Sequence, residues 1–417
     1  MSQEKTTLLS KIILTSLLIT QLSYSNFNKS ITTKIMEFAS NNPKTFIALT
    51  STAIAVPTIA ITSYFINKKE DEIDSLGNTK LLLACKNNNI KKVKQLLSKS
   101  QKNIVNRANK KGNTPLYYAC KNDNIEMIKC LIANGADLNQ EVCNRGFSVI
   151  QCALFNNDMM KLLIDNGCDI DKGPMGRSML MIFCVKPDDH DSAECFSDAA
   201  EYLLNFGADA NKTADDGTTA IFYALSQKNS EKDFDLIELL VANGANIDKA
   251  NLEGITPLIL CCNEPDFEFT RYLLEFGADA NKANNDGHTP FFYALQKKSI
   301  EIMDLLLTYG ADINAIDESG ATPLIYSLYS EKIDFHMVKY LVSNGADVNK
   351  ANKYSTTPLN IACYKNNIEI VKYLIENGAK KTINIMNTNG YTPLKIAIEN
   401  NNQEMIEYLI SQGAIEQ

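Results

Sequence analysis

One phrase recurs along this chain at an interval near 33 residues, and this period constrains the fold more than any other feature. The phrase begins G-x-T-P-L-x-x-A, as in residues 112–119, and closes L-L-x-x-G-A-D-x-N, as in residues 131–139. The closing glycines lie 32 to 40 residues apart, at Gly135, Gly167, Gly207, Gly244, Gly277, Gly310, Gly345, Gly378 and Gly413. Such a period indicates a stacked array of small repeated units.

Each part of the phrase has a local structural reason. Thr114 can accept a hydrogen bond from an otherwise unpaired backbone N–H, and Pro115 suits the first position of a helix. A second segment carries apolar residues at helical spacing and ends at Gly135, a residue that tolerates positive φ. Each unit is therefore expected to be a pair of short helices. One pair cannot bury its apolar face alone, so stacking on neighbouring units must stabilise it.

Ten such units are expected between residues 74 and 417. The first is atypical, because Thr79-Lys80 replaces Thr-Pro and its end lacks G-A-D. The expected boundaries are 74–106, 109–140, 143–172, 173–212, 214–249, 251–282, 284–314, 317–350, 352–386 and 387–417. Over this region the chain resembles ankyrin-repeat proteins. The resemblance implies an all-α solenoid of helix-turn-helix units with finger-like loops. It also implies that protein partners bind on the fingers and first helices, and that the array has no active site or cofactor.

Composition narrows the function classes. The net charge is −8 and the isoelectric point is about 5.2, which argues against a nucleic-acid-binding array. All eleven cysteines lie between Cys85 and Cys363 and show no C-x-x-C spacing. Cys85 and Cys120 occupy one position in adjacent units, but packed helices lie about 8–10 Å apart, too far for a disulfide. The cysteines therefore indicate thiols in a reducing compartment.

The N-terminal region differs from the array. Residues 45–67 carry no charge and are long enough to cross a hydrocarbon core of about 30 Å. We expect a transmembrane helix there; the alternative is a buried helix that caps the array. Residues 1–28 form a hydrophobic leader, either a signal peptide or a first membrane helix. In both cases residues 45–67 bring the chain back to the cytosolic side of the membrane. The reduced thiols also favour placing the array in the cytosol.

Few side chains are grouped in a way that could carry chemistry. Residues 187–195 (PDDHDSAEC) include Asp, His, Glu and Cys, which can ligate a metal ion. Their spacing is irregular, however, so we expect 188–195 to be a mobile loop without a metal. We expect His288 and His336 to be isolated polar residues. The sequence contains no nucleotide-binding or hydrolase motif, and we expect neither an enzyme nor a small-molecule substrate.

Candidate contacts with a partner are residues that break the repeat pattern. Four tyrosines share one register of the first helix and are expected in the core between units: Tyr118, Tyr223, Tyr293 and Tyr326. Exposed aromatic and arginine side chains dominate binding hot spots. The candidates at the ends of first helices and in the fingers are Phe155, Arg177, Leu252, Ile255, Tyr329, Tyr354, Tyr364 and Tyr391.

The sequence thus predicts a membrane-anchored, non-enzymatic scaffold that binds an unidentified protein. Its leader and composition resemble those of membrane-anchored ankyrin-repeat proteins of obligate intracellular bacteria. That resemblance implies an effector that acts on host proteins. The alternative is a housekeeping scaffold within its own cell, and a more distant one is a metal-dependent enzyme that uses the 187–195 segment.

Overall fold

The fold is built from helices, which confirms the all-α expectation over the described part of the chain. The computed structural model describes residues 73–98, 104–143, 146–185, 190–226 and 234–416. These ranges contain no β-strand. They belong to two units of contact, Met1–Asn144 and Arg145–Gln417, here called unit 1 and unit 2. Residues 1–28 and 45–67, with the expected leader and membrane helix, lie outside the described ranges.

Unit 1 contains two helix pairs in its described residues. The first pair is α5 (Lys80–Lys86) with α6 (Ile90–Leu97), and the second is α7 (Pro115–Lys121) with α8 (Ile125–Ala133). Helix α5 packs against α7, and α6 against α8, so like helices stack on one another. Their shared core includes Leu81, Leu116 and Met127, which have almost no exposed surface.

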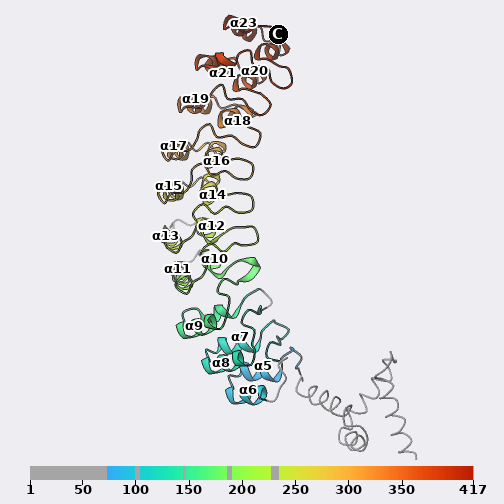
Figure 1. Cartoon of the computed structure of the whole chain (residues 1–417), viewed down its shortest axis with the longest axis vertical. Helices are drawn as coiled ribbons and strands as arrows, with labels where there is room; N and C mark the ends of the chain where they lie inside the picture. The colour runs from blue at the N-terminus through green and yellow to red at the C-terminus, as the bar shows by residue number, and fades with distance from the viewer. Residues whose placement is uncertain (1–72, 99–103, 144–145, 186–189, 227–233, 417) are drawn as a thin grey trace, which may run out of the picture. The chain divides into compact units, whose positions relative to one another are not determined.

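Unit 2 repeats this arrangement. Its first helices, here called inner helices, form one column in Figure 1 and its second helices, the outer helices, form another, with loops projecting beyond the inner column. The pairs are η2 (Val149–Ala153) with α9 (Asn157–Asp165), α10 (Met179–Phe183) with α11 (His190–Asn205), α12 (Ala220–Leu225) with α13 (Phe234–Ala242), α14 (Pro257–Asn263) with α15 (Phe267–Glu275), α16 (Pro290–Gln296) with α17 (Ile300–Thr308), α18 (Pro323–Tyr329) with α19 (Phe335–Ser343), α20 (Pro358–Tyr364) with α21 (Ile368–Glu376), and α22 (Pro393–Glu399) with α23 (Gln403–Ser411). Two short 3-10 turns, η3 (Pro174–Gly176) and η4 (Ala379–Thr382), lie between pairs.

The Thr-Pro pairs begin inner helices as the sequence predicts. The Thr114 hydroxyl accepts a hydrogen bond from the Tyr117 amide at 3.1 Å, and Thr256 accepts one from Ile259 at the same distance. Removing such a cap costs about 1 kcal/mol. Thr289 is an exception, because its buried hydroxyl makes no cap hydrogen bond.

Asparagine side chains link successive units at the G-A-D-x-N segment. The Asn314 amide donates to the Gly345 carbonyl at 3.1 Å, and its oxygen accepts from the Asp347 amide at 2.7 Å. Asn281 makes the same two hydrogen bonds to the following unit. Asp248 occupies this position in an earlier repeat. Its side chain accepts a hydrogen bond from the Asp279 amide but donates none, because a carboxylate has no N–H. The terminal Asn of the repeat phrase therefore joins neighbouring units directly.

The structure corrects the expectation for the 187–195 segment. Residues from His190 onward form the first turns of α11, which runs to Asn205 and is the longest helix of the described residues. The mobile loop predicted for 188–195 is therefore wrong from His190 onward, and residues 186–189 lie outside the description. The polar residues of this segment extend the outer helix at its N-terminal end instead of interrupting the array.

Burial of the outer-helix core agrees with the repeat pattern. Leu273 and Leu274 of α15 are 0% and 3% exposed. The closing Gly135 and Gly413 adopt φ of 85° and 100°, as expected for the residue after a helix end. The ten cysteines whose side chains the structure describes form no disulfide. Within the described ranges, no helix combines the length and apolar character needed to cross a membrane.

Candidate functional site

The finger loops of unit 2 are joined into a row by backbone hydrogen bonds. The Leu252 amide donates to the Asp216 carbonyl at 3.0 Å, and the Asn285 amide donates to the Glu253 carbonyl at 3.1 Å. The loops approach so closely that a Cβ on Gly217 would lie 2.8 Å from the Leu252 nitrogen, and Gly217 has φ of 82°. Only glycine fits such a position without strain. The loop tips are therefore held at fixed spacing, and their side chains form a continuous surface with the inner helices.

The eight candidate partner contacts all lie in unit 2 and differ in exposure. The five most exposed are Tyr364 at 74%, Leu252 at 70%, Phe155 at 62%, Tyr354 at 60% and Tyr329 at 50%. Arg177 is also exposed, whereas Ile255 and Tyr391 are half-buried. These last two are less exposed than the sequence suggested: Ile255 lines a pocket described below, and the Lys395 ammonium lies 4.9 Å from the centre of the Tyr391 ring.

The structure brings some of these candidates together. The Asn352 amide at the base of the Tyr354 loop donates to the Tyr329 hydroxyl at 3.2 Å, so both tyrosines belong to one part of the surface. Lys365 donates to the Tyr329 carbonyl at 3.1 Å and fixes the end of α18. Phe155 lies elsewhere, because its ring packs 5.8 Å from that of Tyr202 on an outer helix. The surface formed by the finger loops and the inner helices, here called the inner surface, therefore includes Tyr329 and Tyr354 but not Phe155.

A cavity of about 510 Å³ opens between the finger loops and the inner helices α12, α14 and α16. We call it the Tyr223–Tyr293 pocket. Tyr223, Leu260 and Tyr293, each four residues after an N-cap, lie in its wall with Ile255. Further lining residues are Arg177, Asp216, Thr218, Phe222, Ser226, Asn251, Glu253, Ile259 and Asn263.

The tyrosine register is not the buried core that the sequence suggested. Tyr118, Tyr223, Tyr293 and Tyr326 are all half-buried. The Tyr293 hydroxyl accepts from the Asn284 amide at 3.1 Å, and burial raises the pKa of its phenol, with the charges of Asp286 and Glu253 adding to the effect. Repetition alone suggested a core, but a residue four positions after the cap faces the finger loops. This register could have been identified from the N-cap spacing.

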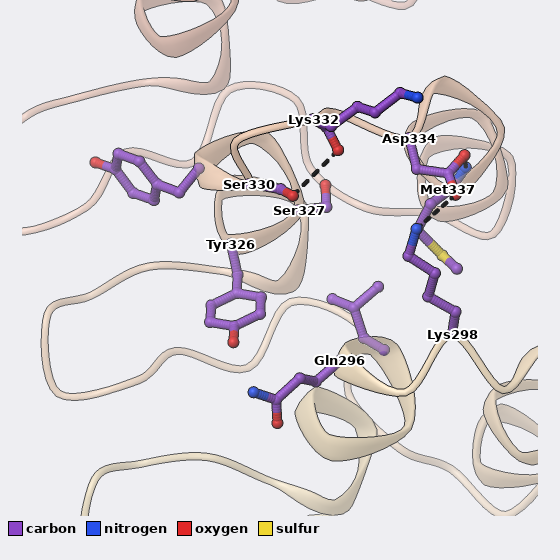
Figure 2. Close-up of a pocket in the computed structure, with 10 residues that line it drawn as sticks. Gln296, Lys298, Tyr326, Ser327, Ser330, Lys332, Asp334 and Met337 are labelled. Carbon is purple, nitrogen blue, oxygen red and sulfur yellow. Dashed lines mark hydrogen bonds and ion pairs between the residues drawn. The ribbon is translucent and has the colours of Figure 1, made fainter.

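A second pocket, of about 350 Å³, lies where the inner helices α16 and α18 end (Figure 2). It exists because five residues connect α18 to α19, whereas three connect α16 to α17. Lys298 and Asp334 form an ion pair at 3.1 Å across it, and this hydrogen bond lowers the pKa of the Asp334 carboxyl. The Ser330 hydroxyl donates to the Lys332 carbonyl at 3.1 Å within the longer connection. These contacts hold the connection in place beside the exposed Tyr329.

His288 is not the isolated residue expected from the sequence. Its ring lies 5.1 Å from that of Phe292 and 6.1 Å from that of Tyr326, and its Nε2 is 3.8 Å from Asp317. His288 thus joins an aromatic cluster beside the Tyr223–Tyr293 pocket. Among the described residues, no group of three or more His, Cys, Asp or Glu side chains is arranged to hold a metal ion. The side chains of 190–196 are outside that statement.

Comparison with protein families agrees with this geometry. The profile described as "Ankyrin repeats (3 copies)" matches residues 50–142, 81–174, 149–232, 228–317 and 324–416. The chain belongs to the ankyrin-repeat family. A second profile, "Ankyrin repeats (many copies)", matches residues 297–342 of this ankyrin-repeat protein. No curated protein matches its sequence. Ankyrin repeats are typically non-enzymatic scaffolds for protein partners, and neither profile indicates a catalytic family.

Proposed function

We propose that this ankyrin-repeat protein is a membrane-attached scaffold that binds another protein on the finger loops and inner helices of unit 2. The observation that supports the binding surface most directly is the exposed group of Tyr329, Tyr354 and Tyr364, which are 50%, 60% and 74% exposed on the loop and inner-helix side. Tyrosines contribute strongly to binding because they bury a large area at a small cost in conformational entropy.

The exposed tyrosines are held in place before any partner binds. The Tyr354 carbonyl accepts from the Thr388 amide at 3.0 Å, which fixes its loop against the next one. Tyr364 is the last residue of α20, whose other residues are almost entirely buried. A rigid, preorganised surface loses less conformational entropy on binding.

Affinity capture with paired variants tests this surface. The full-length chain carrying Tyr354→Ala and Tyr364→Ala should lose its specific partner, because both side chains leave the inner surface. The matched control is Phe267→Ala with Tyr309→Ala. Phe267 begins the outer helix α15 and Tyr309 follows the outer helix α17, and they are 40% and 42% exposed. Retention of the partner by the first variant and its loss by the control would show that we have chosen the wrong face.

We also propose that residues 45–67 anchor the protein in a membrane with the array in the cytosol. The proposal rests on an uncharged stretch of sufficient length in the sequence. Alkaline carbonate extraction of membranes tests it. Full-length protein should stay in the pellet, and a chain of residues 74–417, which lacks both hydrophobic segments, should be released. Release of the full-length chain by carbonate would favour the buried cap instead.

The biological role that we favour is that of an effector acting on host proteins, and its support is the resemblance of the leader and composition described above. The alternative is a housekeeping scaffold within its own cell. Capture of the partner during growth inside host cells separates the two. A partner encoded by the host supports the effector role, and a partner from the same cell as this protein supports the housekeeping role.

A further inference from the structure

The Tyr223–Tyr293 pocket already holds one cation, which is a side chain of the protein itself. The Arg177 guanidinium lies over the Tyr223 ring, 5.1 Å from its centroid. Arg177 immediately precedes the N-cap of α10, and Tyr223 is four residues after the N-cap of the next inner helix. Hydrogen bonds from Thr218 lower the pKa of the Asp216 carboxyl, and the nearby positive charge of Arg177 lowers it further. The chain thus combines a cation, a tyrosine ring and a carboxylate at this junction.

The equivalent positions two repeats later lack the cation. Ile255 immediately precedes the N-cap of α14 and so occupies the position of Arg177, while Tyr293 on α16 occupies the position of Tyr223. Both side chains line the pocket, together with Glu253. Aliphatic Ile255 therefore leaves the tyrosine and the carboxylate of this junction without the cation that Arg177 supplies two units earlier.

Apart from Arg177, the charged residues that line the pocket are acidic. In four successive finger loops, two tip residues precede the glycine that is equivalent to Gly217, which gives eight tip positions. Five of them are acidic: Asp215, Asp216, Glu253, Asp286 and Glu318. No Lys or Arg occupies any of these eight tip positions. A row of carboxylates beside a concave pocket attracts cations over a long range and speeds their association. The following loop carries Lys353, so the acidic row ends there.

We propose that the Tyr223–Tyr293 pocket binds the side chain of an arginine or lysine in an extended segment of the partner protein. The aliphatic part of that side chain packs on Ile255 and Leu260, and its charged end lies against Tyr293 beside Glu253 and Asp286. An aromatic face with nearby carboxylates is a favourable environment for such a cation. This inference rests on the proposed function, because it names the chemistry of the partner at that surface.

Peptide selection on the full-length chain, purified in a nonionic detergent, tests the inference. Random 12-residue peptides displayed on phage are selected on the immobilised protein. The tightest binder is then synthesised twice, once unchanged and once with its arginine replaced by neutral citrulline or its lysine by neutral acetyl-lysine. We expect a shared basic residue among the selected peptides. Neutralising it should weaken binding roughly tenfold, because the cation–π contact and the charge attraction are both lost.

Variants of the chain locate the contact. Glu253→Gln with Asp286→Asn should weaken the basic peptide by a similar factor and leave the neutral peptide unaffected. Ile255→Arg should abolish binding, because it reproduces the Arg177–Tyr223 arrangement with the chain's own guanidinium. Glu301→Gln, on the exposed side of the outer helix α17, is the matched control and should bind normally. Circular dichroism of each variant checks that the helices remain folded.

The inference is overturned if the neutral peptide binds as tightly as the basic one, if the Glu253 and Asp286 variant is unaffected, or if selection enriches no basic peptide. Failure of the proposed function has a different signature. If selected peptides lose binding with Tyr354→Ala and Tyr364→Ala but ignore the citrulline exchange, the surface is correct and the cation pocket is wrong. If neither set of variants changes binding of any captured partner or peptide, both proposals fail.

Discussion

The asparagine link between units predicts how strongly one side chain couples neighbouring repeats. Replacing Asn314 with Ala removes two hydrogen bonds, one to the Gly345 carbonyl at 3.1 Å and one from the Asp347 amide at 2.7 Å. Each is worth about 0.5–1.5 kcal/mol net, so the free energy of unfolding of this region should fall by about 1–3 kcal/mol. Asp248→Asn should act in the opposite direction, because it adds the donor that Asn281 and Asn314 already supply.

Hydrogen-exchange mass spectrometry measures this coupling locally. Arrays of repeats can unfold in parts, so a single global midpoint would not isolate one junction. In Asn314→Ala, the peptide covering residues 345–349 should exchange roughly 5- to 150-fold faster, which corresponds to about 1–3 kcal/mol. The equivalent peptide after Asn281, residues 310–313, which excludes the substituted position, should change much less. Lys297→Ala, an exposed substitution outside the link, serves as the control and should leave both peptides unchanged.

Two results would contradict this reasoning. If Asn314→Ala leaves exchange of residues 345–349 unchanged, the side chain does not hold the next unit, and the two hydrogen bonds are worth little in water. If Asp248→Asn destabilises the chain, then the carboxylate at that position has a role that its hydrogen bond to the Asp279 amide does not explain.

Further predictions concern packing, thiol chemistry and metal content. Leu274→Ala removes a side chain that is 3% exposed and should cost about 2–5 kcal/mol, whereas Phe155→Ala, 62% exposed, should lower the melting temperature less. Burial raises the pKa of the Cys262 thiol to about 12, so iodoacetamide should label it at pH 8 far more slowly than half-buried Cys143, as peptide mass spectrometry can show. Cys262 labelling should rise with pH as its thiolate fraction grows. Because the possible ligands in residues 187–195 are irregularly spaced in the sequence, elemental analysis of purified protein should find no stoichiometric zinc, and a chelator should leave the helical circular dichroism unchanged.

The sequence was sufficient for the helix pairs because their signals are local. A Thr-Pro start such as Thr114-Pro115 acts within one helical turn, and the glycine after the outer helix sets its own φ. The apolar spacing placed Leu273 and Leu274 correctly in the core. The His190–Cys195 segment was misread for the same reason: its polar composition favours a loop locally, but it continues the outer helix α11.

The sequence by itself determined the repeated unit, its family and the residues that break its pattern. Tertiary structure decided which of those residues act together. Stacking places Ile255 and Tyr293, which belong to successive repeats, in one pocket with Glu253. It also makes Tyr293 half-buried and brings Tyr329 beside the loop of Tyr354. Helix propensity and capping depend on neighbours along the chain, whereas a binding surface depends on the distance between units, which only the packing of helix on helix sets.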